Sequence, residues 1–415
     1  ASLIAIGSGD EAFALLNGID CIKFPEVLFH TALARIGESR YEEAIPILRQ
    51  YVQSALITEY QRVVGNLNLS GAHIFMHQYQ EAEVLLKTLL EDIDRNFPQA
   101  FLIRGVALEY MAQIKIALGK YPEAFDLLSS SAEVHRGADH VHRLTLEKWR
   151  IVASFESHRN ASMIGDRAVE VENQKVLRDQ FRVLRTKAIS SRSWETAREC
   201  DFFLARLFFD WDSYMCVRFG SPMSAYQKRL DETFGSPNEN SCSKFDWAPQ
   251  KEVTSIRSVS VRIDLSSGLI HLKGGKTLSI SELRPGLMPL RLLNLLCEDF
   301  YRPVRIGQVF RQLYPAEYFD PFSSPNRIAQ IVLRVNQLFR SSGIDFSVSQ
   351  QDIGFTINAG EGIVISKSFM DSPMFHPYES SLRTAKFHLQ NTKFSCSDFK
   401  NVVCLSSRSA ERVLR

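Results

Sequence analysis

A short pattern, an aromatic residue followed three positions later by alanine, recurs along the first half of the chain. It occurs at Tyr41–Ala44, Tyr79–Ala82, Tyr121–Ala124 and Trp194–Ala197. The first three copies are 38 and 42 residues apart, and the last interval of 73 residues is close to two such units. A degenerate copy is expected around residues 160–163. Self-similarity at this period predicts that this half of the chain is built from successive helical repeats.

The residues around the pattern favour pairs of closely packed helices. Residues 10–235 hold few Gly or Pro, lack strand signals, and place apolar residues at i, i+3, i+4 and i+7, as in Leu28–Ile36 and Ala107–Leu118. In each copy the small alanine lets two helices approach closely, and the aromatic side chain fills the turn between them. We expect Gly37 and Gly119 to end the first helix of their pairs in the left-handed conformation that glycine tolerates.

The segments Leu33–Gly37 with Tyr41–Ala44, and Ile116–Ala124, resemble the tetratricopeptide repeat family, with longer periods than the family standard. The resemblance covers roughly residues 24–215. It implies a curved solenoid whose concave face binds a peptide, a protein partner or another copy of the chain. An all-helical scaffold without a ligand is the alternative.

The formal net charge of +2 over 415 residues is divided unevenly. Residues 253–415 hold 20 Lys and Arg against 13 Asp and Glu, so the remaining 252 residues hold 29 against 34. An acidic part joined to a basic part is the charge distribution of a protein that contacts nucleic acid with one end only. Turn-forming residues between Gly235 and Ser243 mark the boundary, so we assign a repeat domain to residues 1–235 and a linker to residues 236–254.

Beyond the linker the hydrophobic period changes from helical to alternating. Residues 259–273 alternate around a turn at Ser266–Gly268, and Gly274–Gly275 makes a second turn, which predicts an antiparallel meander. Helical patterns follow over residues 288–296, 306–313 and 324–340, and a hairpin is expected over residues 346–357 with Gln350-Gln351-Asp352 at its tip. For the third helix we expect Ser324 as N-cap and Pro325 in the first turn.

The third helix carries a candidate DNA-reading surface. Its expected buried stripe is Ile328, Ile331, Val332, Val335, Leu338 and Phe339. Side chains that donate and accept hydrogen bonds lie on the opposite side: Arg327, Gln330, Arg334 and Gln337, preceded by Asn326. Arg pairs with guanine edges and Gln with adenine edges in the major groove, so these five residues are the candidate DNA-binding residues of this helix.

Strands, three helices and a closing hairpin in this order resemble the OmpR-type winged helix-turn-helix, the DNA-binding domain of many bacterial response regulators. Leu278–Glu282 ahead of the first helix and Gly354–Ile357 in the closing strand carry the resemblance, over residues 255–365. It implies that Arg327, Gln330, Arg334 and Gln337 read the bases. The sequence departs from the family pattern at Arg284-Pro285-Gly286, in the absence of a basic run at residues 336–338, and in Asp352 at the wing tip. A winged domain that binds protein rather than DNA is the alternative.

A second helix-turn-helix is expected at the C-terminal end, after a connector over residues 366–379. Residues 380–415 contain a short helical pattern, a turn and a second helix opened by serines, with Leu405–Leu414 similar to the motif between the second and third helices of bacterial winged-helix regulators. The arrangement places Ser407, Arg408, Ser409 and Arg412 where a recognition helix meets phosphates and bases. Because the pattern stops inside that helix, we expect the natural protein to continue beyond Arg415.

Several protein classes are disfavoured. Seven cysteines without a CxxC pair argue against a disulfide framework or a zinc site, and the histidines at 73, 77, 135, 140 and 142 are interpreted as surface or turn residues. No segment is long and apolar enough to span a membrane or to export the chain, which predicts a cytoplasmic protein. No Walker loop, GxGxxG or GxSxG pattern indicates an enzyme or a cofactor.

The sequence therefore predicts a mainly α multidomain protein: a tetratricopeptide-like α-solenoid, an α+β winged helix and an incomplete C-terminal helix-turn-helix. We expect a cytoplasmic bacterial transcriptional regulator that binds double-stranded DNA. In this hypothesis a protein, a peptide or a second protomer controls it through the repeat domain, since no receiver domain precedes the winged helix. A protein-protein adaptor whose winged folds bind no DNA is the alternative.

Overall fold

The computed structural model describes residues 15–368 except 17, 38–39, 136–139, 162–166, 222–223, 236–243, 248–258, 281–287, 316 and 352–353. The chain divides into two compact units. The first, the repeat unit, comprises residues 9–217 and 223–233, and the second, the sheet unit, comprises residues 218–222 and 234–415. Each unit is described by itself.

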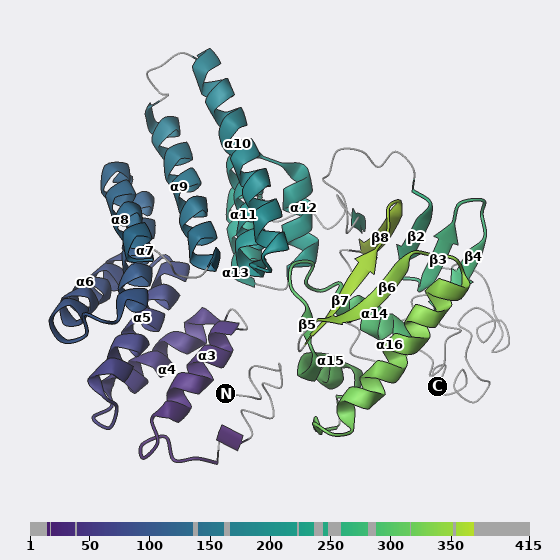
Figure 1. The fold of residues 1–415 in the computed structure, drawn as a ribbon, viewed down its shortest axis with the longest axis horizontal. Helices are drawn as coiled ribbons and strands as arrows, with labels where there is room; N and C mark the ends of the chain where they lie inside the picture. The colour runs from purple at the N-terminus through teal and green to yellow at the C-terminus, as the bar shows by residue number, and fades with distance from the viewer. Residues whose placement is uncertain are drawn as a thin grey trace. The chain divides into compact units, whose positions relative to one another are not determined.

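The repeat unit is a succession of helices, labelled as in Figure 1. They are α3 (Glu26–Gly37), α4 (Tyr41–Gln53), α5 (Glu59–Phe75), α6 (Tyr79–Asn96), α7 (Phe101–Ala117), α8 (Tyr121–Val134), α9 (His140–Ala161), α10 (Arg167–Ser190), α11 (Trp194–Phe208), α12 (Trp211–Gly220) and α13 (Ser224–Phe234). Consecutive helices from α3 to α11 contact one another. In addition α5 contacts α7, α7 contacts α9, and α9 contacts α11. The unit is therefore a helical repeat-like array in which these alternate helices form one layer.

Each aromatic-x-x-Ala copy lies at the start of a helix, directly after the turn in which the sequence placed the aromatic side chain. Tyr41, Tyr79, Tyr121 and Trp194 are the first residues of α4, α6, α8 and α11. The alanine three positions later has no exposed surface in any of the four copies. Since a larger side chain would have no room there, the alanines set how closely the paired helices approach.

The turns before these helices share one backbone hydrogen bond. The residue before each aromatic donates its N–H to the carbonyl five positions earlier, at 2.8 to 2.9 Å: Arg40 to Arg35, Gln78 to His73, Lys120 to Lys115, and Ser193 to Ala188. This is the closure of a helix C-terminus by a left-handed residue. Gly119 adopts the predicted left-handed φ of +73°, and His77 and Arg192 occupy the matching place at +57°.

The expectation for Gly37 is wrong. It is the last residue of α3 and its φ is not positive. In the copies at Tyr79, Tyr121 and Trp194 the left-handed residue lies two positions before the aromatic, whereas Gly37 lies four positions before Tyr41. The degenerate copy expected around residues 160–163 lies largely outside the described residues.

In its described residues the sheet unit contains two small sheets and three helices. Its elements are β1 (Lys244–Trp247), β2 (Val261–Asp264), β3 (Leu269–Leu272), β4 (Thr277–Ser279), α14 (Met288–Leu296), β5 (Val304–Arg305), α15 (Ile306–Leu313), α16 (Ser324–Ser341), β6 (Phe346–Gln351), β7 (Gly354–Ala359) and β8 (Ile363–Ser368). The first sheet has the order β1-β8-β2-β3-β4, and the second has the order β5-β7-β6. One buried apolar cluster joins the helices to both sheets.

Most of the predicted elements of this unit are confirmed. The antiparallel meander is β2, β3 and β4, and α14 and α15 have the predicted bounds. Two strands differ from the prediction: β1 lies in the segment assigned to the linker, and β8 returns to pair with β2 in parallel and with β1 antiparallel. Helix α16 begins one residue earlier than expected, with Ser323 in the N-cap position, while the Ser324 hydroxyl accepts from the Asp320 N–H at 2.9 Å.

The described residues contain no helix that is long and apolar enough to cross a membrane. Cys21, Cys200, Cys216 and Cys297 are free thiols.

Candidate functional site

Helix α16 is anchored to the sheet unit by the predicted apolar stripe. Ile328, Ile331, Val335 and Phe339 are buried, and Val332 and Leu338 pack partly buried against the same cluster. The helix contacts α14, α15 and β6. Since about three helical turns are anchored in this way, the direction of the outward face is set by the core.

The Asn336 side chain hydrogen-bonds the β6–β7 hairpin to this helix. The Asn336 amide donates from Nδ2 to the Val348 carbonyl at 2.9 Å and accepts at Oδ1 from the Val348 N–H at 2.8 Å. Both groups of one β6 residue are thereby satisfied by the helix. The hairpin has the predicted place beside α16, and its register pairs Gln351 with Gly354. The expected tip residue Asp352 lies outside the described residues.

The outward face of α16 carries most of the predicted DNA-binding residues. Asn326, Gln330 and Gln337 are exposed, whereas Arg327 and Arg334 are half-buried along the edge of this face. The same face has further exposed positions that were not predicted as part of it: Ala329, Leu333 and Arg340. Helical periodicity could have predicted the exposure of Leu333. This residue does not belong to the buried apolar stripe, and the helical period places it between Gln330 and Gln337 on the outward face.

The guanidinium of Arg327 has partners within the sheet unit. Its NH2 group donates to Glu317 Oε1 at 3.0 Å, its NH1 group pairs with Glu317 Oε2, and its Cζ lies 3.8 Å from the centre of the Tyr314 ring. A guanidinium engaged with a carboxylate and an aromatic ring must exchange those contacts before it can reach a base or phosphate. Arg327 is thus held beside the outward face rather than presented on it.

Two exposed aromatic residues lie in the segment before α16. Tyr318 is 80% exposed and Phe322 is 89% exposed. Aromatic side chains this exposed are typical of binding surfaces. Their exposure could have been predicted from the sequence, because they are aromatic residues in a segment rich in turn-forming residues. Ser407, Arg408, Ser409 and Arg412, the candidate residues of the C-terminal helix-turn-helix, lie outside the described residues.

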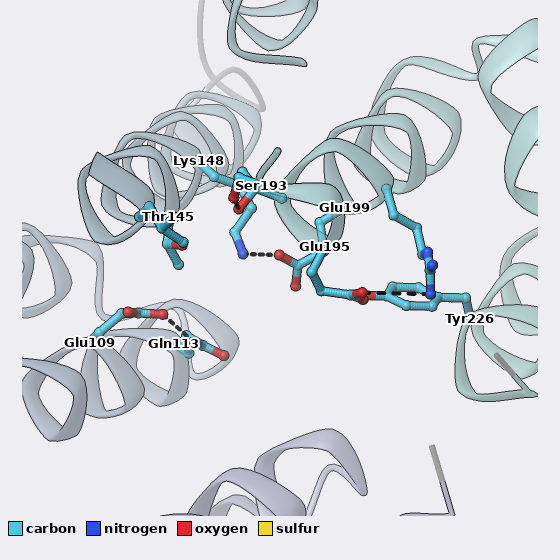
Figure 2. Close-up of polar contacts among 11 residues, drawn as sticks. Glu109, Gln113, Thr145, Lys148, Ser193, Glu195, Glu199 and Tyr226 are labelled. Carbon is cyan, nitrogen blue, oxygen red and sulfur yellow. Dashed lines mark hydrogen bonds and ion pairs between the residues drawn. The ribbon is translucent and has the colours of Figure 1, made fainter. Parts of the chain in front are cut away.

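The repeat unit holds a buried cluster of charged residues, shown in Figure 2. Lys148 of α9 is 1% exposed and forms an ion pair with Glu199 of α11. Glu109 of α7 is 5% exposed and accepts from Gln113 Nε2 at 3.1 Å. The three charged residues come from α7, α9 and α11 of one layer. The ion pair links α9 to α11, and the Lys148 ammonium acts on the Glu109 carboxyl of α7 electrostatically.

Burial dominates the electrostatics of this cluster. It raises the pKa of the Glu109 carboxyl to about 7, although the ammonium of Lys148 opposes the shift. A carboxyl with this pKa changes its charge near neutral pH, so the cluster binds a proton in the range where ordinary glutamates are ionised. No motif or spacing in the sequence predicts this raised pKa.

Two histidines interpreted as surface or turn residues are buried. His73 is 1% exposed and its Nδ1 is 2.6 Å from the Gln78 amide oxygen, and His135 is 2% exposed and stacks on His142 with ring centres 4.5 Å apart. Both lie at helix ends that pack into the repeat layers. Within the described part of the chain, no three His, Cys, Asp or Glu side chains gather as a metal site would require.

No protein-family model, curated protein or solved structure matches this chain. What is established is a mainly helical protein with a helical repeat-like N-terminal region and a C-terminal region that contains small sheets.

Proposed function

We propose that this protein is a cytoplasmic, DNA-binding transcriptional regulator. In this proposal the sheet unit acts as a winged helix-turn-helix of the OmpR type, with α16 as its recognition helix. The repeat unit acts as a tetratricopeptide-like domain that binds a protein, a peptide or a second copy of the chain.

The observation that carries the proposal is the outward face of α16. Asn326, Gln330 and Gln337 are exposed at i, i+4 and i+11, with Arg334 at the edge of the same face. Amide side chains recognise adenine and arginine recognises guanine, each through two hydrogen bonds in the major groove. The opposite stripe is buried, so the unit can present this face at a fixed angle, as recognition helices require.

The order of elements supports the same interpretation. Three helices precede the β6–β7 hairpin, and β5, between the first two helices, pairs with β7. The Asn336 contact with Val348 holds the hairpin against α16, which is the relation of a wing to its recognition helix. The excess of seven positive charges beyond residue 252 favours an anionic ligand for this part of the chain.

The test is selection of duplex DNA from a random library by the full chain at low salt, followed by titration of the enriched sequence. We expect a specific sequence to be enriched and its affinity to fall steeply as salt rises, since each phosphate contact contributes about −0.9 to the logarithmic slope. Arg334→Ala should weaken binding, whereas the matched control Arg262→Ala, on β2 and ion-paired to Asp246, should not. Failure to enrich any sequence, together with flat salt dependence, contradicts the proposal.

A protein-binding adaptor is the second candidate, favoured by two observations. Arg327 is engaged by Glu317 and Tyr314 rather than presented outward, and Tyr318 and Phe322 are highly exposed beside the start of α16. An adaptor would bind through these aromatic residues and would be insensitive to Arg334→Ala. Loss of partner binding in Phe322→Ala, in a chain that enriches no DNA, would decide for the adaptor.

A further inference from the structure

Helix α13 contacts a part of the repeat unit far from its own place in the sequence. The Arg229 guanidinium donates from NH2 to the carbonyl oxygen of Phe75 at 2.9 Å, and its Cζ lies 5.3 Å from the centre of the Phe75 ring. The two residues are 154 positions apart. In a repeat array each unit contacts its neighbours, so a terminal helix that only continued the array would not reach the end of α5.

Helix α13 also contacts α11, which lies at the other end of the array from Phe75. The Tyr226 hydroxyl donates to Glu195 Oε1 at 2.9 Å, and its ring meets Phe202 edge to face with centres 5.3 Å apart (Figure 2 shows the Tyr226–Glu195 contact). Tyr226 is 1% exposed and Leu230 has no exposed surface. Tyr, Arg and Leu at i, i+3 and i+4 therefore form one binding face of this helix.

The surface that receives α13 combines aromatic rings with carboxylates. Phe75 stacks on Tyr41 of α4 with ring centres 4.4 Å apart. Burial raises the pKa of Tyr41, the carboxylates of Glu195 and Glu199 raise it further, and the Arg229 guanidinium opposes them. Arg229 thus lies where a negative potential from α11 meets the aromatic pair, and it complements both the charge and the rings.

We propose that this surface, formed by Tyr41, Phe75, Glu195 and Phe202, is a helix-binding site of the repeat unit, with α13 as its intramolecular occupant. A partner protein binds there by presenting an amphipathic helix with Tyr, Arg and Leu at the spacing of α13, and it displaces α13 in doing so. The inference rests on the proposed role of the repeat unit in partner binding. It adds the place of binding and the chemistry of the partner.

An intramolecular occupant lowers the apparent affinity for any competitor. The apparent dissociation constant equals the intrinsic one divided by the fraction of molecules whose site is open. If α13 leaves the site in about one molecule in a hundred, a competing helix binds about 100-fold more weakly than to an open site. Removing α13 from its site should therefore strengthen binding of a competitor by at least about tenfold.

The experiment measures fluorescence anisotropy of a labelled synthetic peptide of residues 224–234, titrated with the full chain and without DNA. Leu230→Asp in the chain places a charge in the apolar part of the contact and should release α13, so this variant should bind the peptide at least about tenfold more tightly than the unaltered chain. Lys228→Ala, at an exposed position of the same helix, is the matched control and should bind like the unaltered chain. A labelled peptide that itself carries Leu230→Asp should bind to none of the chains.

A second variant guards against misfolding of the first. Arg229→Ala removes the contacts with Phe75 and the positive charge beside Tyr41, but it keeps the buried Tyr226 and Leu230. It should therefore strengthen peptide binding less than Leu230→Asp but more than Lys228→Ala. If Leu230→Asp loses its helical circular dichroism, Arg229→Ala decides the question. The proposal is overturned if no chain binds the peptide, or if the folded variants bind it no more tightly than the Lys228→Ala control. Since no DNA is present, a failure to bind DNA would not affect either outcome.

Discussion

In the buried charged cluster of the repeat unit, we expect Glu109→Gln and Glu199→Gln to change the free energy of unfolding in opposite directions. Burial raises the pKa of Glu109 from 4.5 to about 7 in the folded chain. The folded state therefore binds a proton that the unfolded state releases between these pH values. Its contribution to stability is fully present below about pH 4.5 and is lost as pH rises through about 7.

The magnitude follows from the difference between the two pKa values. One pH unit corresponds to about 1.4 kcal/mol, so ionising Glu109 costs the folded chain about 3 kcal/mol at pH 8 as an order of magnitude. Glu109→Gln keeps the shape and the contact with Gln113 but cannot ionise. We expect this variant to match the unaltered chain near pH 4.5 and to be more stable by up to about 3 kcal/mol at pH 8.

Glu199→Gln is the matched control from the same cluster. It leaves the ammonium of Lys148, which is 1% exposed, without its carboxylate. Breaking a buried ion pair costs about 3 to 5 kcal/mol, and the amide oxygen of Gln recovers part of this as an acceptor, so we expect a loss of about 2 kcal/mol at pH 8. The assay is urea unfolding followed by far-ultraviolet circular dichroism at pH 5 and pH 8. The reasoning is refuted if Glu109→Gln destabilises the chain at pH 8 or if its effect does not change with pH.

The remaining predictions concern packing, a turn and the hairpin. Ala82→Leu should destabilise the chain by about 1 to 3 kcal/mol in urea unfolding, because Ala82 has no exposed surface, whereas Val84→Leu at a 66% exposed position should change little. Gly119→Ala should lower the thermal midpoint by an amount equivalent to about 1 kcal/mol, since φ is +73° there; an unchanged midpoint would contradict the turn geometry. Asn336→Ala should cost about 1 to 3 kcal/mol and speed amide exchange of Val348, because both hydrogen bonds to β6 are lost; unchanged exchange would show that the hairpin is held otherwise.

Local steric patterns explain what could be predicted from the sequence. The aromatic residues that begin α4, α6, α8 and α11 were found because each turn is closed by residues within six positions of one another. The bounds of α14 and α15 followed from apolar periodicity for the same reason. Gly37 was misjudged because glycine permits a left-handed conformation without requiring it, and the turn places that conformation two residues before the aromatic.

Contacts between distant segments explain what could not be predicted. Strands β1 and β8 are short and pair across more than 100 residues, so neither carries a local signal. The Lys148 ammonium that acts on Glu109 and the Phe75 partner of Arg229 likewise lie on other helices, far away in the sequence. The line of polar residues on α16 was predicted from the helical period alone. The pairing of Arg327 with Glu317 depends on how the segment before α16 folds back, and helical periodicity carries no information about that.

The central claim, that the outward face of α16 reads DNA, is tested most directly by comparing two duplexes with two proteins. The duplexes are a sequence enriched by the full chain and a shuffled sequence of the same composition, and the proteins are the unaltered chain and the double variant Gln330→Ala, Gln337→Ala. We predict that the unaltered chain prefers the enriched duplex and that the double variant loses about 1 to 3 kcal/mol of that preference for each base contact removed, while its affinity for the shuffled duplex is unchanged. Equal preference in both proteins would contradict the assignment of α16 as the reading helix.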